Sequence, residues 1–143
     1  RHDAYWACVA LRPGTKAVAT DVCVPISRLA ECITESRRDL DALGLVAPIV
    51  GHVGDGNFHV SLLVDMEAPD EVARAQSFMG KLVKRAIAMD GTCTGEHGIG
   101  HGKAKYLRAE LGDAVDFMRM IKRAIDPRDI MNPGKILPEG TNH

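Results

Sequence analysis

The first half of the chain shows one strand pattern followed by one helix pattern. Residues 15–26 (TKAVATDVCVPI) are rich in Val and Thr and alternate imperfectly with polar positions, which favours a strand. Pro25 then opens a segment with helical spacing of apolar positions, and Gly44 stands where a helix C-cap is expected. The positions that define this helical stripe are Leu29, Ile33, Ser36, Leu40 and Leu43.

A hairpin and a second helix are predicted next. Residues 47–53 and 58–65 are both strand-like, and the GDGN between them favours a tight turn because Gly and Asn tolerate positive φ. A helix is expected to start at Pro69 and to end near Asp90, with one apolar stripe along it. That stripe consists of Ala75, Phe78, Met79, Leu82, Ala86 and Ile87.

The last third is predicted to be a loop followed by helices. Residues 92–103 (TCTGEHGIGHGK) hold four glycines, which makes them a loop, and a short helical stretch surrounds KAKYLRAEL. Asp113 is the expected N-cap of a last helix that stops at Asp126 before Pro127. The residues of this helix that are expected to point inward are Val115, Met118, Ile121 and Ile125.

This order of elements predicts an α+β fold. Short antiparallel strands with helices on one face are typical of a ferredoxin-like sheet, followed here by a C-terminal helical tail. A parallel α/β sheet is the less favoured alternative. We expect one domain over residues 1–143, with the tail over 102–143.

Composition and charge narrow the class of protein. The 143 residues are 45% hydrophobic and 26% charged with a net charge of −1, which gives no electrostatic footprint for nucleic acid or an anionic membrane. Four cysteines without a CxxC pair indicate reduced thiols, so we expect a cytoplasmic protein. The apolar runs are too short to predict a membrane span, and residues 1–14 do not show the n-region and cleavage site that would predict a signal peptide. Because the chain starts without Met, we expect a fragment of a longer polypeptide.

The stretch GHVGDGNFH carries the first candidate chemistry. If GDGN is a four-residue hairpin loop, His52 pairs directly with His59 and both imidazoles project from one face of the sheet. Directly opposed Cβ atoms lie about 4.5–5.5 Å apart, which lets two imidazole nitrogens meet one divalent ion. The alternative is that one histidine is a satisfied core or surface residue and that the glycines only turn the chain.

The second glycine-rich loop offers further ligands. TGEHGIGHG presents Glu96, His97 and His101 on a flexible backbone, and a carboxylate with two histidines is a common catalytic metal set. We therefore predict Glu96 as the third ligand and His97 as a neighbouring acid or base, with a solvated loop as the alternative. The loop lacks the Walker A spacing before Lys103 and is not GxGxxG, so it does not indicate nucleotide binding.

Three motifs in order, GHVGDGNFHV, GTCTGEHGIGHGK and IDPRDIMNPGKILP, resemble the C-terminal region of the flavin-dependent 2-hydroxy-acid dehydrogenases. This group includes D-lactate dehydrogenase and the FAD subunit of glycolate oxidase, in the vanillyl-alcohol-oxidase superfamily. TDVCVPISRL is also similar, so most of the chain is covered. The resemblance implies a cap domain that carries the substrate site over a flavin, while FAD is bound mainly by an N-terminal domain of the same polypeptide that is absent here.

The resemblance also implies roles for individual residues. A divalent metal (Zn, Mn or Fe) is held by His52, His59 and Glu96, and His97 matches the histidine expected to act as general base. Asn132 matches a flavin contact, with a simple turn residue before a proline as the alternative. Arg1 aligns with an arginine near the substrate carboxylate.

Two functions remain open from the sequence. The first is oxidation of a D-2-hydroxy acid to the 2-oxo acid by hydride transfer to FAD. Ala19 and Thr20 stand where relatives specific for larger diacids carry a lysine, which favours a lactate-like substrate. The second is a non-enzymatic metal- or ligand-binding ferredoxin-like module. For the enzyme, we expect a cytoplasmic location, with any contact to the inner membrane made through its electron acceptor. We also expect the isolated fragment to form oligomers.

Overall fold

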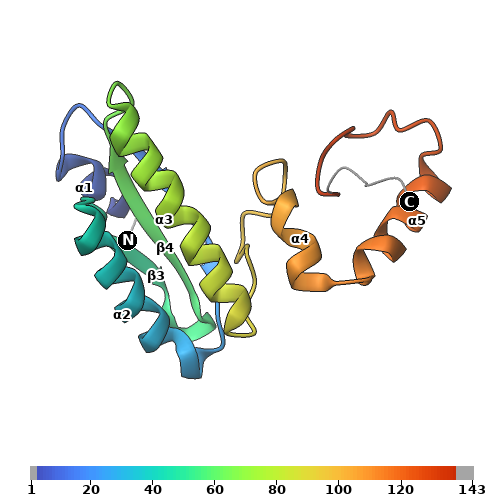
Figure 1. Cartoon of the computed structure of the whole chain (residues 1–143), viewed down its shortest axis with the longest axis horizontal. Coiled ribbons are helices and arrows are strands. Elements are labelled where there is room, and N and C mark those ends of the chain that lie inside the picture. The colour runs from blue at the N-terminus through green and yellow to red at the C-terminus, as the bar shows by residue number, and fades with distance from the viewer. Residues whose placement is uncertain (1–2, 138–143) are drawn as a thin grey trace. The chain divides into compact units, whose positions relative to one another are not determined.

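The computed structural model describes residues 3–137, so the candidate substrate residue Arg1 lies outside the described residues. Two compact units are distinguished by their internal packing, Arg1–Gly95 and Glu96–His143, and each is described by itself (Figure 1). The second unit starts a few residues before the tail predicted from residue 102. The single domain predicted over 1–143 stays a prediction.

The first unit is built on a small antiparallel sheet with β4 (Asn57–Val64) at its centre. One edge of β4 pairs with β3 (Ile49–His52), and the other pairs with β1 (Lys16–Ala19) and β2 (Val22–Cys23). β1 and β2 keep the same register along β4, because Lys16 lies opposite Val64 and Cys23 lies opposite Asn57. The one strand predicted over 15–26 is therefore present as two pieces, separated at Thr20 and Asp21.

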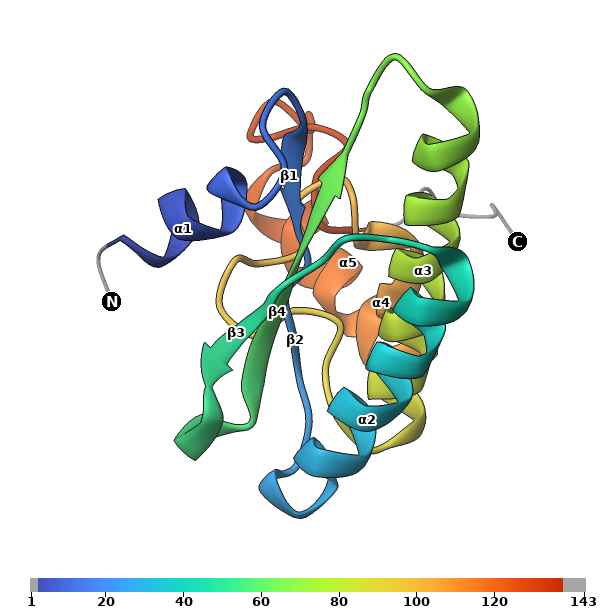
Figure 2. The ribbon, with the colours of Figure 1, turned by 90° about the vertical axis from the view of Figure 1, so that its left-hand side faces the viewer.

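Two long helices cover one face of this sheet. Figure 2 shows α2 (Ile26–Leu43) and α3 (Pro69–Ala88) together on one side of the strands, and the two helices contact each other. α2 ends as predicted, with Gly44 in the left-handed conformation at φ 62°. The core lies between helices and sheet and is formed by alternate residues of β4 and by the apolar stripes of the helices. Its fully buried side chains include Phe58, Val60, Leu62, Val64, Phe78, Leu82 and Leu40. The predicted α+β class with a small antiparallel sheet is confirmed.

A polar clamp joins the two helices at the edge of this core. The guanidinium of Arg85 on α3 donates to Glu35 and Asp39 on α2, and also to the hydroxyl of buried Ser36. The hydrogen bond from Arg85 holds the pKa of Asp39 below its ordinary value. Ser36 is the polar member of the predicted apolar stripe. It can be buried because its hydroxyl donates to the carbonyl of Cys32 within the same helix.

One helix of the first unit was not predicted. α1 (Ala4–Ala10) precedes β1 and buries only Cys8. The segment after it is held by Arg12, which forms an ion pair with Glu71 on α3 and donates to the carbonyl of Leu63. No helix within residues 3–137 is long and apolar enough to span a membrane.

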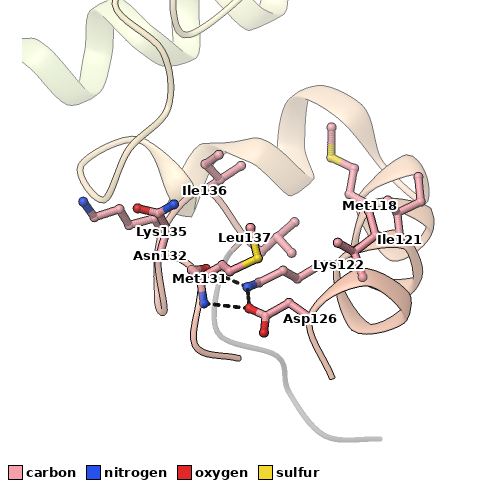
Figure 3. Close-up of a pocket in the computed structure, with 10 residues that line it drawn as sticks. Met118, Ile121, Lys122, Asp126, Met131, Asn132, Lys135, Ile136 and Leu137 are labelled. Atoms are coloured by element: carbon pink, nitrogen blue, oxygen red, sulfur yellow. Dashed lines mark hydrogen bonds and ion pairs between the residues drawn. The ribbon is translucent and has the colours of Figure 1, made fainter. Parts of the chain in front are cut away.

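The second unit consists of α4 (Ala104–Leu111), α5 (Ala114–Ile125) and an irregular tail. Buried Asp126 fixes the start of the tail, since its carboxylate accepts from the backbone N–H groups of Ile130 and Met131. Lys122 forms an ion pair with the same carboxylate and donates to the Met131 carbonyl (Figure 3).

The inward packing predicted for the last helix is wrong, except at buried Val115. Met118, Ile121 and Ile125 are 38%, 60% and 70% exposed. The helix is amphipathic as the pattern requires, but the described part of the second unit supplies too little apolar surface to cover that face. Part of it lines an open apolar pocket with Met131 and Ile136 from the tail (Figure 3).

Candidate metal centre

The β3–β4 hairpin places both candidate histidines on one face, in a register that differs from the prediction. His52 lies opposite Asn57 and His59 lies opposite Val50, so the two histidines are diagonal neighbours and their predicted direct pairing is wrong. The loop starts one residue before GDGN, because Val53–Asp55 form a short 3-10 turn that ends at Gly56 with φ 74°. Diagonal neighbours share a face, since side chains alternate with period two.

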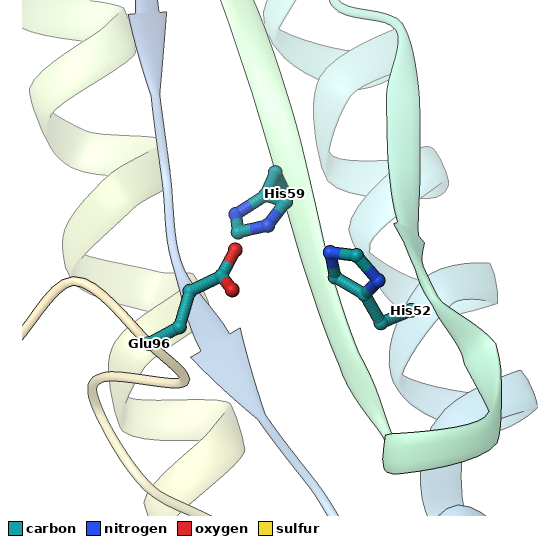
Figure 4. Close-up of side chains that lie close together, drawn as sticks. All are labelled: His52, His59 and Glu96. Carbon is teal, nitrogen blue, oxygen red and sulfur yellow. The ribbon is translucent and has the colours of Figure 1, made fainter. Parts of the chain in front are cut away.

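The two imidazole rings approach each other across this diagonal. Their centroids lie 6.3 Å apart and their planes cross at 89°. One ligand atom from each of His52, His59 and Glu96 lies within 4.8 Å of the other two, and no other such group of three or more His, Cys, Asp or Glu residues occurs among residues 3–137. Figure 4 shows the Glu96 carboxylate pointing toward the two rings. In the chain, Glu96 follows Gly95 directly.

The orientation of His59 is set by an interruption of the strand opposite it. The backbone N–H of Thr20 donates to the Val60 carbonyl, but the N–H of Val60 donates to the Thr20 hydroxyl instead of to its carbonyl. The released Thr20 carbonyl lies 3.0 Å from Nδ1 of His59. Because a carbonyl only accepts, Nδ1 carries the proton, and Nε2 keeps the lone pair that a metal requires.

The loop that leads to Glu96 is held by a buried carboxylate. Asp21 is 3% exposed, and its Oδ2 accepts from the Thr94 hydroxyl at 2.9 Å and from the Gly95 N–H at 3.0 Å. Its Oδ1 lies 3.8 Å from Nδ1 of His59. Thr20 therefore orients the His59 ring through a hydrogen bond, and Asp21 holds the loop that leads to Glu96. The sequence did not indicate this supporting role for either residue, because a strand pattern does not show which side chains turn toward a neighbouring loop.

A buried acceptor beside the ligands is left unsatisfied. Asn57 is 6% exposed, and its Oδ1 has no hydrogen-bond partner among the described residues. Asn57 and His59 are two apart on β4, so both side chains lie on the face that carries the cluster. An orphaned buried oxygen is costly, and it indicates that a further polar group belongs at this end of the sheet.

Cys23, the one half-exposed cysteine, is not a good ligand here. Its thiol donates to the Asp55 carbonyl at 3.2 Å, and burial together with nearby Asp21 and Asp55 raises its pKa. A raised pKa keeps the thiol protonated, whereas metals bind the thiolate.

The remaining predicted site residues lie in the second unit. Nε2 of His97 is 3.8 Å from the Glu96 carboxylate, and its side chain is 57% exposed. His101 lies near Gly134 of the tail and is not part of the donor cluster. Asn132 has φ 49° and lines the open pocket beside Lys135 (Figure 3). The roles predicted for His97 and Asn132 stay predictions.

Two relatives are identical to this chain at half or more of the positions in the segment that it matches. A protein of Danio rerio named probable D-lactate dehydrogenase, mitochondrial, is 56% identical over 96% of this chain and 28% of its own length. The D-lactate dehydrogenase [cytochrome], mitochondrial, of Arabidopsis thaliana is 50% identical over 96% of this chain and 24% of its own length. The chain thus spans about a quarter of these relatives.

These relatives overturn one expectation from the sequence. Both are named as mitochondrial proteins, so the predicted cytoplasmic location is wrong. The physical reason is that the absence of CxxC pairs indicates reducing conditions, which do not by themselves separate one reducing compartment from another.

The fold also has a solved counterpart. The 4-ethylphenol oxidase of Gulosibacter chungangensis, in its isoeugenol complex, superimposes with a TM-score of 0.65 over 92% of this chain and 26% of that chain. At 19% identity this likeness shows the fold alone. The family described as FAD linked oxidases, C-terminal domain, matches residues 1–136, nearly the whole chain. Together with the two relatives, this match shows that the chain belongs to the C-terminal domain family of the FAD-linked oxidases.

Proposed function

We propose that this chain is the C-terminal part of an FAD-dependent dehydrogenase that oxidises a D-2-hydroxy acid, D-lactate or a similar small monoacid, to the 2-oxo acid. The observation that carries the proposal is the His52, His59 and Glu96 donor cluster, present in a chain of the FAD-linked oxidase family. The names of the two relatives support the substrate, and they support a mitochondrial location for the whole protein.

The donor cluster fits a catalytic divalent ion. Two imidazole nitrogens and one carboxylate oxygen form a common three-ligand set that leaves positions open for substrate, and Zn, Mn and Fe all accept it. Hydrogen bonding of His59 through Nδ1 supports ligation through Nε2. When bound, such an ion supplies Lewis-acid stabilisation of negative charge on the substrate oxygen.

The proton chemistry is assigned to His97. Oxidation of a 2-hydroxy acid removes the hydroxyl proton and the α-hydrogen, and the C–O bond becomes a carbonyl. We assign the hydroxyl proton to the imidazole of His97, which follows Glu96 directly in the chain. FAD, when bound, supplies the acceptor for the α-hydrogen and its electron pair as hydride. Asn132 is proposed as a contact to the flavin and Arg1 as a contact to the substrate carboxylate.

The exposed apolar face of α5 is proposed to pack against the rest of the polypeptide. The relatives are about four times as long as the segment that this chain matches, so a large N-terminal part is available to cover it. Phe117, Ile121 and Ile125 are each at least 60% exposed in the described structure. Burial of each such side chain contributes about 1.5–3 kcal/mol of favourable free energy. The FAD-binding part of the polypeptide would therefore be stabilised by packing against this face.

The experiment separates the metal role from the base role. In the full-length protein, His52→Ala and His59→Ala should each remove bound metal, as measured by elemental analysis, whereas His101→Ala is the matched control and should retain it. His97→Ala should keep the metal but lose flavin reduction by D-lactate under anaerobic conditions. Unchanged metal content in both ligand variants would refute the metal site, and retained flavin reduction in His97→Ala would refute the base.

The alternative is a non-enzymatic metal- or ligand-binding module of ferredoxin-like form. The same full-length preparation distinguishes it from the enzyme. A protein that binds metal at His52 and His59 but shows no flavin absorbance, and no reduction by any of a panel of D- and L-2-hydroxy acids, would favour the module.

A further inference from the structure

A single buried carboxylate lies behind both halves of the donor cluster. Asp21 sits between β1 and β2, where the ladder along β4 is interrupted. Its side chain is 2% exposed, and it is not one of the residues whose ligand atoms converge. We infer that Asp21 is a positioning residue that sets the affinity of the site for its divalent ion. This inference rests on the proposed metal site and goes beyond it.

The first reason is the hydrogen bonding of the loop that carries Glu96. Oδ2 of Asp21 accepts from the Thr94 hydroxyl and from the Gly95 backbone N–H, at 2.9 and 3.0 Å. Charge-assisted bonds of this kind are stronger than neutral ones, and here two of them fix the two residues before Glu96. A glycine-rich segment would otherwise lose conformational entropy when an ion draws its carboxylate in.

The second reason is the charge behind His59. Oδ1 of Asp21 lies 3.8 Å from Nδ1 of His59, while the proton on Nδ1 is directed to the Thr20 carbonyl. A carboxylate at that distance makes no hydrogen bond, yet its charge favours electron density on the imidazole and strengthens Nε2 as a ligand. Asp21 thus acts on the carboxylate ligand through the backbone and on the imidazole ligand through its charge.

The third reason is steric, and it shows how closely these parts fit. A Cβ added to Gly95 would lie 2.7 Å from Oδ1 of Asp21 and 2.4 Å from Oδ1 of Asn57. Only a glycine lets the backbone approach the two oxygens this closely. The loop is therefore held against Asp21 by contact as well as by hydrogen bonds.

The test compares metal affinity among near-isosteric variants of the full-length protein. Asp21→Asn keeps the shape but removes the charge, and its amide presents a donor where one carboxylate oxygen stood. Titration of metal-free protein with Mn²⁺ or Co²⁺, by calorimetry or by Co²⁺ absorbance, should show affinity weakened about 10–100-fold, the usual effect of losing a supporting group of this kind. Asp55→Asn is the charge-matched control on the exposed hairpin turn, and its affinity should equal that of the parent.

A second pair of variants keeps the test decisive if Asp21→Asn fails to fold. Thr94→Val removes the hydroxyl that Asp21 accepts from, and should also weaken metal binding, whereas Thr94→Ser retains the hydroxyl and should restore it. Thermal unfolding without metal reports any purely structural effect, which would lower stability but leave affinity unchanged. Parent-like affinity in both Asp21→Asn and Thr94→Val would overturn the inference while leaving the metal site standing. A parent protein that binds no metal would overturn the proposed site and this inference with it.

Discussion

Replacement of Gly95 by alanine tests how closely the loop that leads to Glu96 packs against Asp21 and Asn57. The new Cβ would lie 2.4 Å from Oδ1 of Asn57, where ordinary contact begins at 3.4 Å, so one of the two must move by about 1 Å. Neither Asn57 nor Asp21 moves freely, because both are buried and Asp21 is hydrogen-bonded to this same segment. The φ of Gly95 is not in the left-handed region, so the effect is steric alone.

The expected cost follows from overpacking in a closely packed interior. Forcing one extra methyl group into such a site costs about 1–3 kcal/mol, which corresponds to a fall in Tm of about 2–12 °C for a chain of this size. Displacement of the loop also moves Glu96, so we expect metal affinity to fall about tenfold or more. Both changes are measured on one preparation, by urea unfolding at constant m-value and by metal titration.

Gly54 provides the matched control on the same unit. A Cβ at Gly54 would meet nothing within 4 Å, and its φ is ordinary, so Gly54→Ala should change the free energy of unfolding by about 0.5 kcal/mol or less. If Gly95→Ala proves as stable and as tight for metal as Gly54→Ala, then the loop does not pack against Asp21 and Asn57 as described. In that case close packing around Gly95 does not hold Glu96 in place.

Two further predictions concern the rest of the chain. Asp39→Asn should destabilise the protein by about 1–2 kcal/mol at pH 7, because the bond from Arg85 lowers the pKa of Asp39 in the folded state. The contribution of the ionised Asp39 carboxylate to the free energy of unfolding is fully present above the ordinary pKa of 3.8, and it is lost as the pH falls through the lower pKa of the folded state. The urea midpoints of parent and variant should therefore converge in acid. A constant difference between them down to the acid limit would contradict this. Ile121→Glu on the exposed apolar face of α5 should reduce self-association of the 143-residue chain, measured by light scattering, without lowering its Tm. The control variant Arg123→Glu should leave self-association unchanged. Equal self-association of the two variants would show that this face is not responsible for it.

Much of the fold could be predicted because each element carries its own local signal. The helix that ends at Gly44 and the helix that begins at Pro69 lie where the apolar spacing and the end signals place them. α1 was missed because its seven residues bury one side chain and so show little periodicity. The inward face of α5 was mispredicted for a different reason. Amphipathicity shows that a helix has an apolar side, but not which part of the protein covers it.

The candidate site could be predicted only in part, because register depends on the turn. The side-chain period is two, so an error of one residue on each strand left His52 and His59 on the same face although they are diagonal neighbours. A slip of one residue in total would have placed them on opposite faces. The proximity of Glu96 was inferred from the kind of loop it lies on, and its distance to the histidines could not be obtained from the sequence.

The interruption between β1 and β2 explains why the supporting residues could not be found in advance. A continuous strand over 15–26 would pair the Thr20 carbonyl with Val60 and leave none for the His59 ring. Because the Thr20 hydroxyl takes the carbonyl's place, the ladder is satisfied while the carbonyl accepts from His59, and the next residue, Asp21, binds the loop that leads to Glu96. Thr and Asp in a Val-rich stretch show only a strand with a polar interruption. The pairing partner on β4, fixed by tertiary structure, is what makes that interruption part of the site.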